Sequence, residues 1–300
     1  MTVPTNNPKE FRQFEYCGWQ QSVDQYHSSF SSLTSQTIDS LLDSVNAGRD
    51  MELLDIATGP GYVAAQAHKR GCKVTGVDLS DAMVAKARQL NPQIDLRSRY
   101  AMKRSQSVAE RPQLPLRAIE FCQGEAESLP FAESQYQAAV MNFGILHLAE
   151  PEKALGEAFR VIRSQAKFGF TVWSKPDKSI ALKIMNKAIE TYKNTDITLP
   201  EGPPFFLFSE PDYCFKCLQN LGFKNPSVQE IPLLWELSSA DELFDAFYKG
   251  TARTGGILRA QTSQSLDNIR AAIHQETASY RQNNRLLLPM SAIVVSAQKP

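Results

Sequence analysis

The chain has 300 residues, of which 42% are hydrophobic, enough to bury a sizeable core. Its 32 lysine and arginine residues balance 32 aspartate and glutamate residues, so it lacks the basic surplus typical of proteins that grip long nucleic acids. The first twenty residues lack the apolar core of a signal peptide, and no apolar run approaches the ~18 residues that cross a bilayer. We therefore expect a cytoplasmic protein with no membrane span and no nucleic-acid partner.

Strands and helices alternate along the first part of the chain. Residues 10–47 predict two helices. Beyond them, short apolar runs predict strands, and helical patterns with Ser80 as an N-cap, Pro92 as a stop and Pro151 in a first turn predict helices. The expected strands are 51–57, 72–80, 119–123, 136–143 and 167–174, and the helices between them are 63–70, 81–90 and 151–163. This alternation predicts an α/β fold in which helices cover both faces of a parallel sheet.

Two regions depart from the alternation. Residues 93–118 are polar and irregular. Residues 178–285 begin and end with helical patterns around a stretch rich in proline and phenylalanine, and 228–237 and 290–297 look like the last two strands. In an open α/β sheet, ligands bind outside the carboxyl ends of the strands. The loop after the first strand is therefore the place to look for a binding site.

That loop carries the most informative motif. Residues 59–64 match G-x-G-x-x-A between a strand and a helix, a spacing shared by nicotinamide, flavin and S-adenosylmethionine (SAM) sites. Pro60 has no N–H to offer a pyrophosphate, and SAM carries no phosphate. Asp55, at the end of the strand, would oppose a pyrophosphate but would pair with the ammonium of the methionine portion of SAM. Both residues favour SAM over a dinucleotide.

Asp78 ends the second strand, 23 residues beyond Asp55. A carboxylate at this place accepts hydrogen bonds from both ribose hydroxyls, which suits NAD and SAM alike. The alternatives are a turn acid or a helix cap, and Ser80 already fills the capping role. We interpret Asp78 as the ribose ligand.

With these residues in place, residues 50–175 resemble a class I SAM-dependent methyltransferase. The branch is the one that includes the ubiquinone/menaquinone-biosynthesis C-methyltransferases and many small-molecule enzymes. The motifs that carry the resemblance are LLDIATGPGYVAAQAHKRGCKVTGVDLSDAMVAKAR, FCQGEAESLPF, YQAAVMNFGILHLAEPEKALGEAFRVIR and FGFTVWSKP. It implies a Rossmann-like, doubly wound, mostly parallel sheet of seven strands with the last one antiparallel.

The resemblance also implies how the chain is divided. Residues 1–48 form an N-terminal helical cap, and 49–177 form the SAM-binding core, with 93–118 as a basic irregular insertion. Residues 178–300 supply the substrate-capping helices, including a helical insert between the last two strands, together with those strands. The expected activity is methyl transfer from SAM to a small-molecule acceptor, with S-adenosylhomocysteine as the product.

The family's roles carry over by position. Asp55, Gly59 and Gly61 would hold the methionine portion of SAM, and Asp78 the ribose. The adenine would lie beside Leu79 and near Glu125 and Ala126, and the sulfonium beside Asn142 and Phe143. The full set of expected cofactor contacts is Asp55, Ala57, Gly59, Gly61, Asp78, Leu79, Met83, Glu125, Ala126, Asn142, Phe143 and Tyr26.

Three features depart from the family pattern. Glu125 stands where the family usually has aspartate, which lengthens the reach toward adenine. Residues 163–166, Arg-Ser-Gln-Ala, replace a usual Arg-Pro-Gly-Gly turn on the side away from the ligand. The segment 97–117 looks like an insertion with six basic residues against one acid; it is either a solvated surface loop or a site for an anionic partner.

Methyl transfer is an in-line displacement that depends on alignment in a site closed to water, and a hydroxyl, thiol or acidic carbon acceptor also needs a base. His147, after the fourth strand, is the first candidate for the catalytic base, although a structural role in its loop explains it equally well. Other candidates either line the acceptor site or are ordinary packing or surface residues. Trp19, Tyr26 and His27 could cap the pocket, Tyr248 and Arg253 could touch substrate, and Phe205, Phe206, Phe208 and Trp235 suggest an apolar lid. The substrate contacts we select are Trp19, His147, Phe206, Tyr248 and Arg253, which favour an apolar or aromatic acceptor.

Other functions stay open. A nucleic-acid methyltransferase usually has Asn-Pro-Pro-aromatic at the fourth strand, where this chain has Asn142-Phe143-Gly144-Ile145. A protein that binds SAM without transferring methyl would share the same loop, and a nucleotide-dependent dehydrogenase conflicts with Pro60 and Asp55. The five cysteines disfavour a disulfide framework, and the lone pair Cys214 and Cys217 lacks the partners of a zinc site, so we expect no metal.

Overall fold

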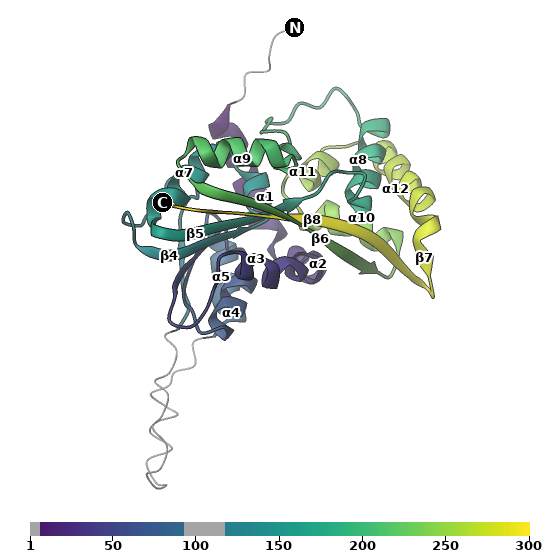
Figure 1. Cartoon of the computed structure of the whole chain (residues 1–300). Helices are drawn as coiled ribbons and strands as arrows, with labels where there is room; N and C mark the ends of the chain where they lie inside the picture. The colour runs from purple at the N-terminus through teal and green to yellow at the C-terminus, as the bar shows by residue number, and fades with distance from the viewer. Residues whose placement is uncertain (1–6, 93–117) are drawn as a thin grey trace.

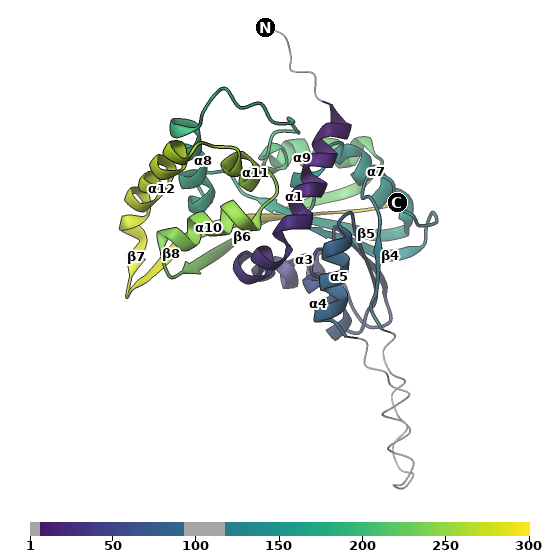
Figure 2. The same ribbon diagram turned by 180° about the vertical axis from the view of Figure 1, so that it is seen from behind.

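The computed structural model describes residues 7–92 and 118–300. The basic residues 97–117, and with them the two interpretations of the insertion, lie outside the described residues. The chain forms a single sheet with helices on both faces (Figures 1 and 2). The strands are β1 (Glu52–Ile56), β2 (Lys73–Asp78), β3 (Glu120–Gln123), β4 (Tyr136–Asn142), β5 (Ile162–Trp173), β6 (Lys224–Leu237), β7 (Arg281–Gln282) and β8 (Arg285–Gln298). The α-helices are α1 (Pro8–Ser29), α2 (Ser31–Thr34), α3 (Ile38–Ser44), α4 (Tyr62–Lys69), α5 (Asp81–Leu90), α7 (Pro151–Val161), α8 (Ile180–Tyr192), α9 (Pro211–Asn220), α10 (Ala240–Gly250), α11 (Arg253–Arg259) and α12 (Ser263–Thr277).

The sheet has the strand order β3-β2-β1-β4-β5-β8-β6. The first five strands in this order are parallel, and β8 inserts antiparallel between β5 and β6. This confirms the expected mostly parallel Rossmann-like sheet with an antiparallel last strand, and α10 to α12 form the expected insert between β6 and β8. One strand was not expected. The two-residue β7 pairs with β8 across Asn283 and Asn284, whose φ angles of 47° and 62° are typical of a tight hairpin turn.

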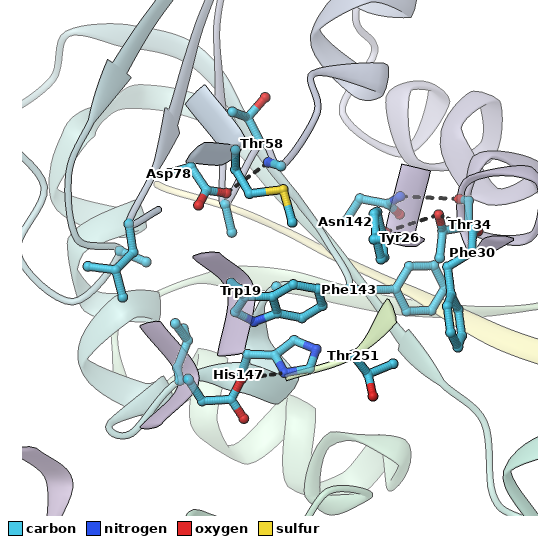
Figure 3. A pocket seen from close by; sticks show the side chains of 18 of the residues that line it. Trp19, Tyr26, Phe30, Thr34, Thr58, Asp78, Asn142, Phe143, His147 and Thr251 are labelled. Atoms are coloured by element: carbon cyan, nitrogen blue, oxygen red, sulfur yellow. Dashed lines mark hydrogen bonds and ion pairs between the residues drawn. The ribbon is translucent and has the colours of Figure 1, made fainter. Parts of the chain in front are cut away.

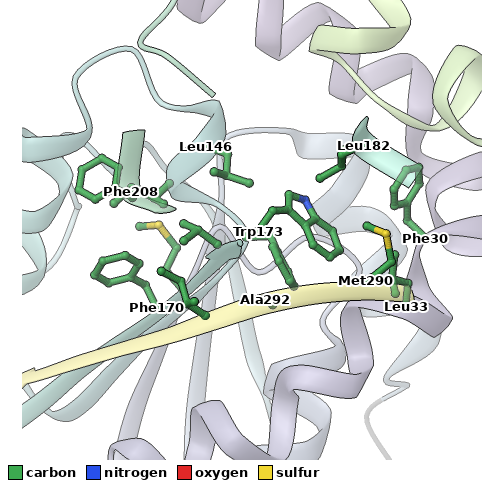
Figure 4. Close-up of a cluster of buried hydrophobic side chains, with 14 of the residues drawn as sticks. Phe30, Leu33, Leu146, Phe170, Trp173, Leu182, Phe208, Met290 and Ala292 are labelled. Atoms are coloured by element: carbon green, nitrogen blue, oxygen red, sulfur yellow. The ribbon is translucent and has the colours of Figure 1, made fainter. Parts of the chain in front are cut away.

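Each face of the sheet has its own apolar core. On one face, α3, α4 and α5 pack Leu41, Ala64 and Val84 against the sheet (Figure 1). On the opposite face, α7 packs on β5, α8 on β8 and α9 on β6, and α10 and α12 extend this core. Figure 4 shows part of the second core, where Phe170, Trp173 and Ala292 lie among side chains of the surrounding helices. These two cores hold the carboxyl ends of the parallel strands at one edge.

Several element boundaries differ from expectation, among them the starts of β5 at Ile162 and of β6 at Lys224. Helix α7 ends at Val161 rather than at residue 163, because Ile162 already pairs with Tyr136 as the start of β5. The Arg-Ser-Gln-Ala segment therefore lies within β5, and Gln165 takes the left-handed φ of 65° that a glycine would adopt more easily. Strand β8 begins at Arg285 rather than at 290 because its first residues pair along β6.

Helix α1 crosses the edge of the sheet and packs on α10 (Figure 2). Asn7 caps the helix by accepting hydrogen bonds from the backbone amides of Lys9 and Glu10. A Cβ atom on Gly18 would lie only 2.6 Å from the Cβ of Ala252, so the glycine lets α1 approach the α10–α11 connection closely. Within the described residues, no helix combines the length and the apolar character that a membrane crossing requires.

The outer edge of β6 is covered by a side chain. Gln36 donates a hydrogen bond from its amide nitrogen to the carbonyl oxygen of Leu234 (2.9 Å) and accepts one from the Leu234 backbone N–H (3.2 Å). The amide thus pairs with the backbone of β6 as a neighbouring strand would. Leu234 itself is 46% exposed.

Candidate functional site

A cavity opens at the carboxyl ends of β1, β2 and β4, where the fold class predicts a ligand. Arg12, Glu15, Trp19 and Tyr26 of α1 line it, and their spacing places them on one face of the helix. In Figure 3, Trp19 lies between Asp78 on one side and His147 on the other. Helix α1 therefore closes a cavity whose two ends carry different polar groups.

Asp55 supplies a buried carboxylate at the end of β1 that is only half satisfied. Its side chain is 0% exposed, and Oδ2 accepts hydrogen bonds from the Thr58 hydroxyl (2.5 Å) and the Ala64 amide (3.1 Å). Oδ1 is buried and has no partner among the described residues. Burial, with a smaller contribution from the charge of Asp78, raises the pKa of Asp55 to about 7, although the two hydrogen bonds lower it. An unpaired carboxylate oxygen beside a cavity favours a ligand that donates hydrogen bonds, and a cationic ligand above all.

Asp78 ends β2 and holds the glycine loop. Oδ2 accepts a hydrogen bond from the Gly59 amide (2.8 Å), and Oδ1 accepts one from the Ser80 amide (2.9 Å). Burial raises its pKa to about 6, and these two backbone hydrogen bonds oppose the shift. Each oxygen keeps further acceptor capacity, so the carboxylate can receive two hydroxyl groups at once.

The loop between these aspartates is built from left-handed residues. Ala57, Gly59 and Gly61 have φ angles of 53°, 52° and 83°. Pro60 lines the cavity and has no N–H to donate. Gly61 is the N-cap of α4 and does not line the cavity; a Cβ atom there would lie 2.9 Å from the ring of Phe121.

At the other end of the cavity, His147 meets a carboxylate from α1. Its Nδ1 lies 3.1 Å from Oε2 of Glu15, whose side chain is only 2% exposed. The ring of Trp19 meets the imidazole edge to face, with centroids 4.8 Å apart, and the ring of Phe205 lies 6.5 Å away. Arg253 lines the same end, donates to the carbonyl oxygen of Pro203 (2.9 Å), and has its pKa lowered by burial. This end of the cavity is aromatic, with a small number of convergent charged groups.

The sequence matches the family described as "Methyltransferase domain" over residues 54–170, the segment that builds the two aspartates and the loop. By this match and its curated relatives, the chain is similar to class I SAM-dependent methyltransferases, near their UbiE branch.

Two curated relatives show how far the sequence similarity extends. The chain is 27% identical over 166 residues to a demethylmenaquinone methyltransferase of Renibacterium salmoninarum, covering 54% of this chain and 60% of that protein. It is 29% identical over 208 residues to the ubiquinone/menaquinone biosynthesis C-methyltransferase UbiE of Roseobacter denitrificans, covering 65% and 75%. The match thus spans less than two thirds of the length of the Renibacterium protein.

The fold has counterparts among solved structures. The [4+2]-cyclase SpnF superposes with a TM-score of 0.54 and 18% identity, covering 100% of this chain and 98% of that one. At this identity the likeness concerns the fold alone. The name of that neighbour also shows that one fold serves more than one reaction.

Most of the predicted cofactor residues lie around the cavity. Gly61 is the exception, because it is the N-cap of α4 and does not line the cavity. The predicted residues that line the cavity are Asp55, Ala57, Gly59, Asp78, Leu79, Met83, Glu125, Ala126, Asn142, Phe143 and Tyr26.

Asn142 and Phe143 take their positions from backbone and threonine contacts. Oδ1 of Asn142 lies 2.9 Å from the Thr37 hydroxyl and 2.6 Å from the Thr171 hydroxyl, and its Nδ2 donates to the carbonyl oxygen of Thr34 (3.2 Å). Phe143 has a φ of 55° and stacks on Trp173 with ring centroids 4.2 Å apart. These contacts orient the amide of Asn142 at the end of β4, and the neighbouring aromatic ring of Phe143 lines the cavity.

Glu125 is joined to a residue that the sequence patterns missed. Its side chain is 44% exposed and lies 3.6 Å from Nε of Arg12. Arg12 also pairs with Glu127 and with Glu150 (3.3 Å), so one guanidinium holds α1 to the loops after β3 and β4. The spacing of Arg12 and Glu15 from Trp19 is the signal that could have found them, since all three share one helix face.

The predicted acceptor-side residues divide into two groups. Trp19, His147, Arg253 and Phe205 line the cavity. The others lie outside it: Phe206 packs edge to face on Phe205, Tyr248 stacks on Phe244, His27 bonds to Tyr62, and Phe208 and Trp235 are buried in the core. Phe206 and Tyr248 therefore play no part in the proposals below.

The cysteine pair lies in α9, where Cys214 is buried and donates to the carbonyl oxygen of Phe208 (3.1 Å). Burial raises the pKa of both Cys214 and Cys217, which keeps them as thiols. In the parts of the chain that the structure describes, no group of three or more His, Cys, Asp or Glu side chains is arranged to hold a metal ion.

Proposed function

We propose that this protein binds SAM in the cavity and transfers its methyl group to a small-molecule acceptor with an apolar or aromatic body. The observation that carries the proposal is the buried Oδ1 of Asp55, which has no partner among the described residues and belongs to a side chain that lines the cavity. A buried acceptor without a donor is costly, so the site is built for a ligand that supplies one. The ammonium of SAM is such a group.

The remaining cofactor contacts follow from the same geometry. Asp78 offers acceptor capacity on both oxygens to the ribose hydroxyls. Leu79 and Met83 supply apolar surface for the adenine, and Ala126 and Glu125 lie on the neighbouring loop. When bound, SAM supplies a methyl group on a cationic sulfur. The sulfur becomes neutral as it leaves, so the transfer needs no metal.

The chain's own residues orient the acceptor and exclude water. The aromatic rings that line the cavity give a flat apolar molecule a complementary surface, and His147 is the group that can take its proton. Helix α1 covers both ends of the cavity, so the reaction would take place away from solvent. The rings that form this surface are Trp19, Phe30, Phe143, Trp173, Phe205 and Phe247.

Two alternatives remain in view. A nucleic-acid substrate is disfavoured by the cover that α1 forms over the cavity and by the absence of a basic surplus in the chain. A protein that binds SAM without transferring methyl would share the cofactor end of the site. The pairing of His147 with Glu15 at the acceptor end supports transfer, because it provides a place for the proton that leaves the acceptor.

Isothermal titration of the purified protein with SAM, S-adenosylhomocysteine and NADPH tests the cofactor. We expect both SAM compounds to bind and NADPH to give no heat. The Asp78→Ala variant should bind SAM about 100-fold more weakly, because it loses two charge-assisted hydrogen bonds to the ribose worth roughly 3 kcal/mol together.

Asp267→Ala is the matched control, since this exposed aspartate lies on α12 and does not line the cavity. It should bind SAM as the unaltered protein does. Binding of NADPH in place of SAM, or an Asp78→Ala variant with unaltered SAM affinity, would contradict the proposal. Circular dichroism of each variant separates loss of binding from loss of fold.

A further inference from the structure

The imidazole of His147 is held by a residue far away in the sequence. His147 lies in the short 3-10 helix Ile145–His147 after β4, and Glu15 lies on α1, 132 positions earlier. Their side chains meet at 3.1 Å, and Oε1 of Glu15 has no partner among the described residues. The contact thus joins α1 to the segment that follows β4.

The hydrogen bond fixes where the proton of the imidazole lies. An ionised carboxylate can only accept, so Nδ1 carries the hydrogen and Nε2 keeps its lone pair. No residue in the described part of the chain hydrogen-bonds to Nε2. The local turn does not need the imidazole either, because the backbone amide of His147 itself bonds to the carbonyl oxygen of Gly144 (3.0 Å). These contacts favour the interpretation of His147 as a base held in one tautomer. They do not favour a structural role in which the imidazole stabilises its own loop.

Neighbouring rings and charges hold the pair in place. Trp19 meets the imidazole edge to face at 4.8 Å, which restricts its rotation. Arg253 lies at the same end of the cavity, where its guanidinium is 5.3 Å from the ring centre of Phe11 on α1. The charge of Glu15 raises the pKa of Arg253 against the larger lowering by burial, so the two charges are close enough to interact.

The position of Glu15 depends on two attachments of α1. One turn before it, Arg12 pairs with Glu127 and Glu150. Beyond it, the side-chain oxygen of Gln20 accepts hydrogen bonds from the Ser80 hydroxyl (2.5 Å) and the Ala82 amide (3.1 Å) at the start of α5. These attachments on either side of Glu15 help to hold α1 where Glu15 reaches His147.

We propose that Glu15 is the positioning residue for His147, and that this base is completed only when α1 lies over the cavity. The inference rests on the proposed function, and it restricts the acceptor to a molecule that loses a proton, such as a hydroxyl or an acidic carbon. As the bond from the acceptor to the methyl group forms and the bond from sulfur to methyl breaks, the acceptor's proton passes to Nε2. The positive charge of the imidazolium is then held beside the Glu15 carboxylate until the proton passes to water.

The ring-nitrogen chemical shifts of the histidines test the pairing directly. The chain has only four histidines, and the His147→Gln variant identifies the signals of His147 by their loss. Spectra are taken without ligand at about pH 8.5, above the ordinary histidine pKa of ~6.5. We expect the Nδ1–H form to dominate in the unaltered protein. In Glu15→Leu, the ratio of the Nδ1–H form to the Nε2–H form should fall at least tenfold, because a charge-assisted hydrogen bond is lost.

Further variants separate positioning from packing. Glu15→Gln keeps the shape and an acceptor oxygen, so it should fall between Glu15→Leu and the unaltered protein. Glu10→Gln makes the same chemical change at an exposed position of α1 and should leave the ratio unchanged. Arg12→Met removes an attachment of α1 without altering either member of the pair, and it should also lower the ratio.

The outcomes distinguish the claims. An unchanged ratio in Glu15→Leu would overturn the positioning role, and an unchanged ratio in Arg12→Met would overturn the dependence on α1. Because the ratio is read without ligand, these results stand apart from the titration with SAM. A protein that fails to bind S-adenosylhomocysteine but keeps the tautomer would contradict the proposed function alone.

Discussion

Replacement of Asp55 by asparagine is expected to weaken SAM binding about 100-fold or more while stabilising the unliganded protein above neutral pH. The two effects have one cause. The carboxylate is buried without a partner on Oδ1, so its charge is costly until a cationic ligand arrives. Asparagine keeps an oxygen for the Thr58 hydroxyl and the Ala64 amide but cannot ionise.

The stability difference should depend on pH in a defined direction. The pKa of Asp55 is about 7 in the folded protein, against a model value of 3.8 for an exposed aspartate. Between these values the folded state holds a proton that the unfolded state has lost, so stability falls as pH rises from about 4 to about 7. Asparagine escapes this loss, and the variant should exceed the unaltered protein by about 2–4 kcal/mol at pH 8, with little difference near pH 4. The titration of Asp78 is common to both proteins.

Urea unfolding at several pH values and calorimetric titration with SAM measure the two effects. We expect SAM affinity to fall about 100-fold or more, as one charge-assisted contact is replaced by an amide that repels the ammonium. A variant that keeps its affinity would show that Asp55 does not hold the ammonium. Parallel stability curves across this pH range would show that its carboxylate is not unpaired in solution.

Gly59→Ala should mainly weaken SAM binding, whereas Gly61→Ala should mainly destabilise the fold, although the two residues are only two positions apart. Gly61 has a φ of 83°, and a Cβ atom there would lie 2.9 Å from Phe121 and 3.0 Å from Nδ2 of Asn91. We expect Gly61→Ala to lower the free energy of unfolding by about 2–4 kcal/mol through strain and overpacking. Gly59 has a φ of 52°, and its Cβ atom would meet nothing within 4 Å. The cost there is about 1 kcal/mol of backbone strain.

Binding should rank the two variants the other way. Gly59 lines the cavity, so its added methyl group would occupy space next to the cofactor, and we expect SAM affinity to fall at least tenfold. Gly61→Ala, measured under conditions where it remains folded, should bind SAM with a smaller loss. Urea unfolding and calorimetry of the same two preparations check the ranking, and equal losses of affinity would contradict the assignment of Gly59 to the cavity wall.

The sequence predicted the cofactor end of the site because its residues are close together in the chain. Asp55, the glycine loop and Asp78 belong to one strand–loop–helix–strand unit, and such a unit has one common geometry. The mostly parallel sheet and its antiparallel last strand followed from the family resemblance. Element ends were less predictable, as at Val161, where pairing between β4 and β5 overrides a helical pattern.

The acceptor end was less predictable because it is assembled from distant segments. Glu15 and His147 meet across 132 positions, and no local pattern reports that contact. The segment 178–285 has no motif to fix which aromatic side chains turn inward, so Phe206 and Tyr248 were selected, whereas Phe205 and Phe247 line the cavity. Trp19 and Arg253 lie at the cavity as expected.

The amide of Gln36 has a consequence for the molecule in a crowded solution. An edge strand with free backbone groups and an exposed leucine is a template on which another chain can add a strand and begin to aggregate. At Leu234 both backbone groups are already occupied by Gln36, and two residues earlier Pro232 has no N–H to offer. Another strand therefore cannot pair with this stretch of the edge strand β6, and Leu234 can stay exposed without recruiting another chain.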